Sequence, residues 1–90
     1  MENFSFIQLF KDKSLEMKAK YGDALILFRM GDLYTMVEED AEIASEILGL
    51  SITISLNRLK STAFPEFCLD TYLPKLVRAG HRICICDGLV

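Results

Sequence analysis

Three cysteines and a single histidine are the most reactive side chains in this chain of 90 residues: Cys68, Cys84, Cys86 and His81. An odd number of cysteines argues against a disulfide framework. Cys84 and Cys86 are two positions apart, which on a strand places both thiols on one face. A structural zinc ion takes about four ligands, and only Cys68, His81 or a carboxylate could complete the set. Because free cysteine packs as a small hydrophobic side chain, we expect reduced cysteines in the core and no metal.

The acidic residues between positions 38 and 42 are the other candidate for chemistry. Glu38, Glu39, Asp40 and Glu42 open a stretch of helical period, and acids favour the first turn of a helix because the positive end of its dipole lies there. A lone histidine and scattered cysteines do not indicate a nucleophile with its base. The chain also lacks G-x-x-x-x-G-K-[ST] and G-x-G-x-x-G, the glycine-rich patterns that hold phosphates. We therefore predict no catalytic residues, no nucleotide and no cofactor.

The composition is that of one small globular domain with an acidic balance. Apolar residues make up 51% and charged residues 26% of the chain, which is typical of folded proteins. Ten Lys and Arg against 13 Asp and Glu give a net charge of −3 and a pI near 5.0. Autonomous nucleic-acid-binding domains usually have a pI above about 9. Any nucleic-acid contact must therefore come from a local patch or from partner domains.

Neither a membrane span nor a signal peptide is visible in the sequence. No apolar run reaches the ~18 residues needed to cross a bilayer. The first residues, Met1–Phe4, lack the basic segment of a secretory signal. We expect a cytoplasmic protein that does not contact a membrane.

The first half of the chain predicts a helix followed by a β-hairpin. Ser5 and Gln8 have the spacing of a capping box at the start of that helix. Residues 24–28 form a short, continuous apolar run, which predicts a strand covered on both faces and central in a sheet. Gly31–Asp32 suits a two-residue type II′ turn, since glycine accepts a positive φ at the first turn position. Residues 33–37, rich in β-formers, are the predicted return strand.

The middle of the chain predicts a helix, a strand and a loop. The helix opens at Glu38 and closes at Gly49. Residues 50–56 alternate almost perfectly between apolar and polar types, which predicts a half-buried strand. Its inward side chains are Leu50, Ile52, Ile54 and Leu56. Residues 57–67 combine mixed polar types with a proline and show no period, so we predict a loop.

The last part of the chain predicts a third helix and a final strand over residues 82–86. Asp70 or Thr71 is the expected helix cap, because Pro74 is tolerated only near a helix start. His81 follows a helix-ending glycine, which indicates a surface or strand-edge position. The order of elements, α-β-β-α-β-α-β, predicts an α/β (α+β) fold with a mixed β-sheet flanked by about three helices.

Three separated blocks of the sequence match one known pattern. Residues 18–32 read KAKYGDALILFRMGD, residues 39–45 read EDAEIAS, and residues 69–82 read LDTYLPKLVRAGHR, followed by ICD at positions 85–87. Their order and spacing resemble the N-terminal, mismatch-recognition domain of the MutS family of DNA mismatch-repair proteins. That family has F-Y-E-x-F after a similar G-D pair, then I-L-G, L-D-x-Y-L-x-K-L-V-x-x-G and I-C-E. The resemblance covers roughly residues 15–90.

The resemblance implies a surface that reaches the minor groove of DNA. In the family, the phenylalanine of F-x-E wedges beside a mismatched base and the glutamate hydrogen-bonds that base. Here Leu33 stands at the phenylalanine position and Thr35 at the glutamate position. Leucine lacks the flat ring whose stacking on a base is worth about 1–3 kcal/mol, and threonine offers a hydroxyl instead of a carboxylate. Tyr34 faces the opposite side of the strand, so we expect it in the core.

The predicted loop carries two more departures and two candidate contacts. The family usually has a basic residue near this position, and Arg58 with Lys60 could contact phosphates; the alternative is an ordinary solvated loop. The family's A-G-x-P-x-H corresponds to residues 62–67, where Phe67 replaces the histidine and Glu66 adds a negative charge.

Length is the largest departure from the family, whose proteins continue into connector, core, clamp and ATPase domains. We expect residues 1–90 to be a single domain of this kind, truncated at its C-terminal end and without a nucleotide-driven clamp. Its sheet would be left with an open edge. Because an open edge invites pairing with another chain, a homodimer is a reasonable hypothesis.

Two functions follow from these patterns. The first is a stand-alone, mismatch-repair-related accessory protein that binds duplex DNA weakly or through partner domains. Its DNA-contact candidates are Leu33, Thr35, Arg58 and Lys60. The alternative is a protein-interaction module that kept the fold but lost mismatch recognition, bound to itself or to another protein. Its contact candidates are Leu33, Met36 and Phe64, with Ser51, Thr53 and Ser55 as a polar sheet face.

Overall fold

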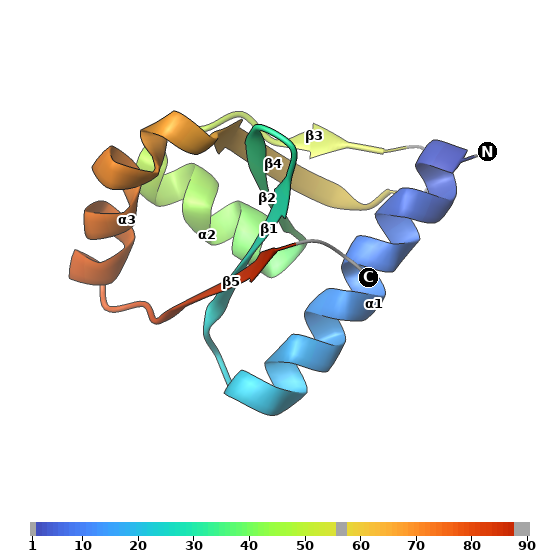
Figure 1. Cartoon of the computed structure of the whole chain (residues 1–90), viewed down its shortest axis with the longest axis horizontal. Helices are drawn as coiled ribbons and strands as arrows, with labels where there is room; N and C mark the ends of the chain where they lie inside the picture. Colours follow the sequence, from blue (N-terminus) through green and yellow to red (C-terminus); the bar gives the residue numbers. More distant parts are fainter. Residues whose placement is uncertain (1, 56–57, 88–90) are drawn as a thin grey trace.

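The computed structural model describes the backbone of residues 2–55 and 58–87 and the side chains of residues 12–55 and 58–87. Its elements are α1 (Glu2–Tyr21), β1 (Leu25–Met30), β2 (Leu33–Val37), α2 (Glu39–Leu48), β3 (Thr53–Ile54), β4 (Lys60–Pro65), the 3₁₀ turn η1 (Glu66–Cys68), α3 (Leu69–Arg78) and β5 (Ile83–Asp87). Within these residues, five strands form one sheet in the order β3-β4-β2-β1-β5 (Figure 1). β5 runs parallel to β1 and the other pairs are antiparallel. The predicted mixed sheet flanked by helices is confirmed.

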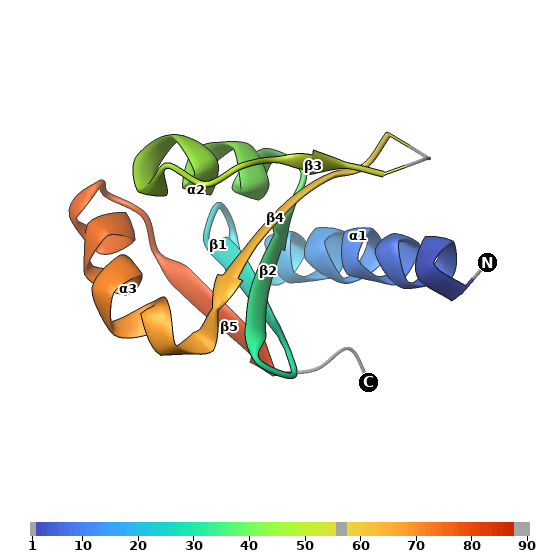
Figure 2. The same ribbon diagram turned by 90° about the horizontal axis from the view of Figure 1, so that it is seen from above.

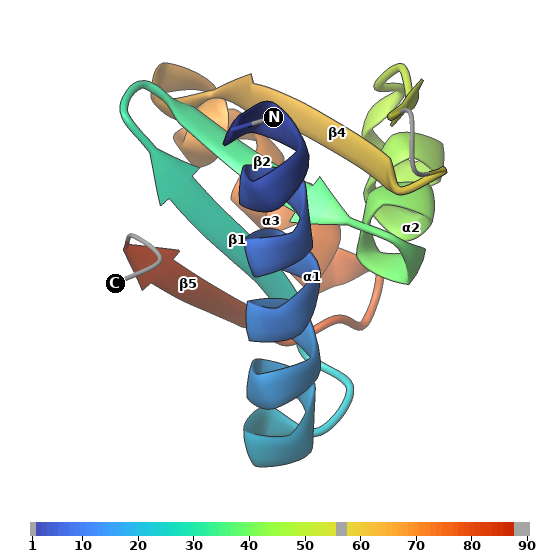
Figure 3. The same cartoon turned by 90° about the vertical axis from the view of Figure 1, so that its right-hand side faces the viewer.

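The sheet separates two apolar layers. α2 and α3 cover one face and α1 crosses the other, as the views in Figures 2 and 3 show. β1 supplies both layers: Leu25 and Leu27 pack with α2 and α3, whereas Ile26 and Phe28 pack on the side of α1. All of them are fully buried. This double burial explains the continuous apolar run and confirms the predicted internal strand.

The β1–β2 hairpin also agrees with its prediction. Met30 pairs with Leu33, so the turn holds two residues. Gly31 has φ 59°, and among the described non-glycine residues only Glu38 and Arg58 have a positive φ. Asp32 therefore has a negative φ, which matches a type II′ turn and excludes type I′.

The predicted loop over residues 57–67 is wrong for most of its length. Residues 60–65 form β4, whose residues 61–65 pair with the whole of β2, and η1 follows directly. Thr62 and Phe64 are buried on one face of β4, with Ala63 exposed between them. The alternation was obscured because Thr62 is polar. Its hydroxyl donates to the Ser51 carbonyl at 2.7 Å, which allows the side chain to be buried.

The predicted strand over residues 50–56 is mostly wrong. Only Thr53–Ile54 pair with β4, at the edge of the sheet. Ile54, expected to face inward, is 63% exposed, whereas Leu50 packs against the core beside α2. Leu56 lies outside the described residues. The sequence alternates over residues 50–56, but among the described ones only two pair with a neighbouring strand, at the edge of the sheet.

The helix ends differ from the predicted caps at two places. α1 begins at Glu2, so Ser5 lies inside the helix and not at its cap; the side chains of Ser5 and Gln8 lie outside the described residues. α3 continues straight from η1, with the Leu69 N–H donating to the Glu66 carbonyl. Since the preceding turn satisfies this backbone group, neither Asp70 nor Thr71 is the cap, and Pro74 lies inside α3. The predicted glycine end of α2 is confirmed.

A buried carboxylate ties α1, β1 and α2 together. The Asp40 side chain is 1% exposed. It accepts a hydrogen bond from the Lys18 Nζ at 2.6 Å and from the Ile26 N–H at 3.0 Å. The same Lys18 ammonium donates to the Ala24 carbonyl at 2.7 Å. One charge pair therefore fixes the end of α1 against the start of both β1 and α2. No described helix is both long and apolar enough to span a membrane.

Candidate functional site

Leu33 and Thr35 share one face of β2 at the hairpin end of the sheet. Leu33 is 45% exposed and Thr35 is half-buried, whereas Tyr34 between them is 6% exposed and lies in the core with Met36. The predicted alternation is thus confirmed. Leu33 lies between Met30 of β1 and Pro65 of β4 in the register of the sheet. The two side chains therefore lie on the face of the sheet that α1 crosses, with Leu33 exposed at its hairpin end.

Contacts between the hairpin and η1 hold this end of the sheet together. The Glu66 N–H donates to the Asp32 carbonyl at 2.7 Å. The Arg29 guanidinium forms an ion pair with the Glu66 carboxylate, and its Nε donates to the Gly31 carbonyl at 3.3 Å. The same guanidinium lies 6.0 Å from the centroid of the Tyr34 ring. The turn of the hairpin is therefore fixed relative to η1, and Arg29 neutralises the carboxylate of Glu66.

The other two candidates lie at the far end of β4. Lys60 is the first residue of β4 and Pro65, the partner of Leu33, is the last. At about 3.4 Å per residue, five positions separate Lys60 from that end by about 17 Å. Arg58 is exposed just before β4. The four predicted contact residues therefore fall into two separate places, not one cluster.

Lys60 is held by acidic residues at the start of α2. Its ammonium forms an ion pair with the Glu42 carboxylate, and this carboxylate raises the pKa of Lys60 above its ordinary range. The Lys60 N–H donates to the Glu38 Oε1 at 3.1 Å, and the Glu38 N–H donates to the Lys60 carbonyl at 2.9 Å. Glu38 also has φ 55°, an uncommon conformation for a residue with a side chain. These contacts join the start of β4 to the start of α2.

The cysteines are distributed over both layers. Cys84 and Cys86 pack on the side of α1, which confirms that they share a face, whereas Cys68 packs on the side of α2 and α3. All three are half-buried. Within the described part of the chain, no three His, Cys, Asp or Glu residues are grouped so that they could hold a metal ion.

Two apolar contact candidates of the interaction hypothesis are wrong. Met36 and Phe64 are buried in the layer under α2 and α3, because both point away from the face of Leu33. Ser51, Thr53 and Ser55 do not form a strand face, since β3 contains only Thr53–Ile54.

Sequence reasoning missed the exposed aromatic residue at the hairpin end. Phe67 lies in η1, two positions after Pro65, and is 82% exposed. The sequence shows that Phe67 replaces a family histidine. It does not show that the side chain is exposed, because residues 57–67 were predicted to be a loop.

Comparison with known proteins places the chain in a family. The family described as MutS domain I matches residues 9–89. The DNA mismatch repair protein MutS of Phocaeicola vulgatus is 54% identical over 78 residues, which cover 82% of this chain and 9% of that protein. MutS of Bacteroides thetaiotaomicron is 51% identical over 79 residues, covering 83% and 9%, and MutS of Flavobacterium johnsoniae is 49% identical over 78 residues, covering 82% and 9%. This chain thus spans about 9% of the length of these curated relatives. It belongs to the MutS domain I family, as the three sequence blocks indicated.

Proposed function

We propose that this mismatch-repair-related domain acts as a DNA-binding accessory domain and meets duplex DNA with the end of its β1–β2 hairpin. The observation that carries the proposal is that exposed Leu33 and half-buried Thr35 share one face of β2, with Tyr34 buried between them. These are the two positions that correspond to the reading residues of the family. The strand that carries these two positions is therefore kept, although both residue types differ from those of the family.

The two side chains can make weak groove contacts. Leu33 is an apolar wedge of the kind that minor-groove proteins insert between base steps. The Thr35 hydroxyl can donate to or accept from base edges, and the minor groove offers both kinds of group. Neither side chain supplies a ring or a carboxylate, so we expect little preference for a mismatch.

Phosphate contacts would come from a second place, at the other end of β4. Arg58 is exposed and forms no ion pair among the described carboxylates. About 17 Å along a duplex corresponds to about five base pairs at 3.4 Å each. Arg58 could therefore contact a phosphate while Leu33 is in the groove. Lys60 would first have to break its ion pair with Glu42, so we expect it to contribute less to phosphate binding than Arg58.

Fluorescence anisotropy with labelled duplexes tests this proposal. The full chain should bind matched and mismatched duplexes with similar affinity at low salt. The double variant Leu33→Phe with Thr35→Glu should gain at least about fivefold preference for the mismatch, the low end of what stacking on one base provides. Ile54→Ala, an exposed position on β3, is the matched control and should change neither affinity. No binding at low salt and tens of micromolar protein would refute the proposal.

A protein-interaction role is the second candidate, and the outer edge of β5 favours it. β5 ends the sheet within the described residues, and Ile85 on it is 45% exposed. An edge strand offers free backbone groups to another chain, so a homodimer could form through β5. Light scattering after gel filtration measures this directly. If the protein is strictly monomeric at high concentration, the homodimer hypothesis is wrong.

A further inference from the structure

We propose that Met17, Cys84 and Cys86 form a binding site for a soft monovalent metal ion, Cu(I) or its analogue Ag(I), between α1 and β5. The three side chains pack against the same apolar cluster on the α1 side of the sheet. All three are half-buried, so an ion can reach them from solvent. The site is separate from the proposed DNA contact, because neither Leu33 nor Thr35 belongs to it.

Strand β5 brings the two thiols to one face of the sheet. Cys84 and Cys86 pair in parallel register with two residues of β1. These partners, Ile26 and Phe28, are buried on the α1 side. Two positions along a strand separate the Cα atoms of the cysteines by about 6.6 Å, and each thiol can turn toward the other by rotation about its Cα–Cβ bond. Two metal–thiolate bonds in line span about 4.6 Å if each has the length found with zinc, about 2.3 Å. The pair can therefore hold one ion between its sulfur atoms.

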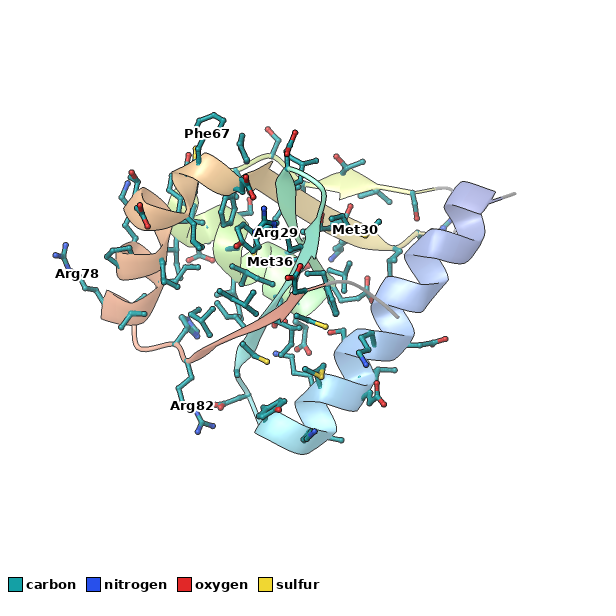
Figure 4. All side chains as sticks on the ribbon, viewed as in Figure 1. Arg29, Met30, Met36, Phe67, Arg78 and Arg82 are labelled. Carbon is teal, nitrogen blue, oxygen red and sulfur yellow. The ribbon has the colours of Figure 1, made fainter. Side chains whose placement is uncertain are left out.

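Helix α1 brings the thioether of Met17 to the same place. Lys13, one turn before Met17, interacts electrostatically with Cys86. Tyr21, one turn after Met17, lines a pocket together with Cys84. Residues four positions apart share one face of a helix, so Met17 faces β5 between the two cysteines. In Figure 4, yellow sulfur atoms lie between α1 and β5, which agrees with this placement.

The donor set selects the class of ion. Thiolate and thioether ligands are soft and favour Cu(I) over hard cations such as Mg²⁺ and Ca²⁺. A structural zinc ion takes about four ligands, and the His, Cys, Asp and Glu residues of the described chain form no group of three. Cu(I) and Ag(I) accept fewer ligands than zinc, so two thiolates and one thioether are enough. Each S–H bond is replaced by a metal–sulfur bond, the thiol protons pass to solvent, and the ion keeps its oxidation state.

Cys68 provides a control within the same chain. It is half-buried like the other two cysteines, but it packs on the side of α2 and α3. An ion that binds to any accessible thiol would use Cys68 as well. A site built by α1 and β5 would leave it free of metal.

Metal titration of the full chain, reduced with a phosphine and kept free of oxygen, provides the main test. Native mass spectrometry with Ag(I) should show one ion per chain, and competition with a coloured Cu(I) chelator gives the affinity. Cys84→Ser and Cys86→Ser should each weaken binding at least about 100-fold, since even the outer partners of metal ligands contribute about 10–100-fold. Met17→Leu, which keeps the size of the side chain, should weaken it about tenfold. Cys68→Ser should leave it unchanged, and circular dichroism checks that each variant keeps the fold.

Protection from alkylation gives a readout that does not depend on any variant. The free thiolate is the nucleophile that N-ethylmaleimide modifies, so coordination removes it from the reaction. With Ag(I) bound, Cys84 and Cys86 should lose their reactivity while Cys68 reacts at its metal-free rate. Peptide mapping by mass spectrometry locates each modified cysteine.

Each contrary outcome overturns the proposal in a different way. Absence of binding of either ion by the wild type overturns it outright. Equal weakening by Cys68→Ser and Cys86→Ser assigns the metal to adventitious binding by any thiol, and unchanged affinity of Met17→Leu removes the thioether from the site. One ion for two chains assigns the thiols to a contact between two β5 edges. Because no measurement contains DNA, all of these outcomes leave the proposed DNA contact standing.

Discussion

At the scale of single residues, Asp40 shows how a charge can be part of the interior of this domain. Its carboxylate is almost fully buried, yet both oxygens are occupied, one by the Lys18 ammonium and one by the Ile26 N–H. A buried charge is tolerated only when it is paired and hydrogen-bonded. Removing the carboxylate leaves the Ile26 N–H without this acceptor and the Lys18 charge without its counter-charge, which costs more than the pair contributes.

We therefore predict that Asp40→Ala destabilises the domain strongly. The loss should be about 3–5 kcal/mol, nearer the lower value because Lys18 is partly exposed and can turn to water. Urea unfolding followed by circular dichroism measures it. Glu39→Ala, one position earlier and exposed, should cost less than about 1 kcal/mol, the range of exposed charges in a first helical turn. Equal losses at the two positions would contradict the structural role of Asp40.

Some side-chain positions of the candidate site and the core could be predicted from the sequence, and others could not. The alternation of Leu33, Tyr34 and Thr35 was predictable, because a strand places successive side chains on opposite faces. The role of Asp40 was not, since an acid at a helix start is explained by the dipole alone. Its partners Lys18 and Ile26 come from α1 and β1 and meet it only in the folded chain. The exposure of Phe67 was equally hidden, because it depends on where η1 turns away from β4.

At the scale of elements, the hairpin is the unit on which the candidate site depends. Gly31 has φ 59° and begins a two-residue turn. An added Cβ at Gly31 would meet no atom within 4 Å. Any penalty for a side chain there is therefore conformational and not steric.

Gly31→Ala should accordingly cost about 1–2 kcal/mol of unfolding free energy. Asp32→Ala at the next turn position, where φ is not positive, should change it by no more than about 0.5 kcal/mol. Denaturant midpoints of the two variants give the comparison. If both variants unfold at the wild-type midpoint, the turn does not require glycine and the type II′ assignment is wrong.

The strength of the local sequence signal decides which helices and strands could be predicted. β1, β2, α2 and the end of α3 carried strong local signals, either apolar runs or glycine ends, and they were found. β3 and β4 carried no such signal. Thr62 is polar yet buried, with its hydroxyl bonded to the Ser51 carbonyl, and Ile54 is apolar yet exposed at the edge of the sheet. Both cases depend on partners distant in sequence, which override local hydrophobic pattern.

At the scale of the whole molecule, charge is divided between the two ends of the sheet. The hairpin end carries Asp32, Glu66, Asp70 and Asp87 against Arg29. The opposite end, where β1 and β5 begin, carries Lys20, Lys75, Arg78 and Arg82 with Asp23. Figure 4 shows Arg82 far from Phe67. Among the residues whose side chains are described, the end that carries the proposed groove contacts is therefore poor in cations.

This division predicts an unusually weak dependence of DNA affinity on salt. Each neutralised phosphate contributes about −0.9 to the slope of log K against log salt concentration. Contact through the hairpin end with Arg58 should give a slope of about −1 to −2, whereas contact through the basic end would give about −3 to −4. Anisotropy between about 25 and 200 mM salt measures the slope. The double variant Arg78→Ala with Arg82→Ala decides between the ends. Unchanged affinity and slope agree with the hairpin, whereas a fall in both assigns DNA to the basic end and removes Leu33 from the interface.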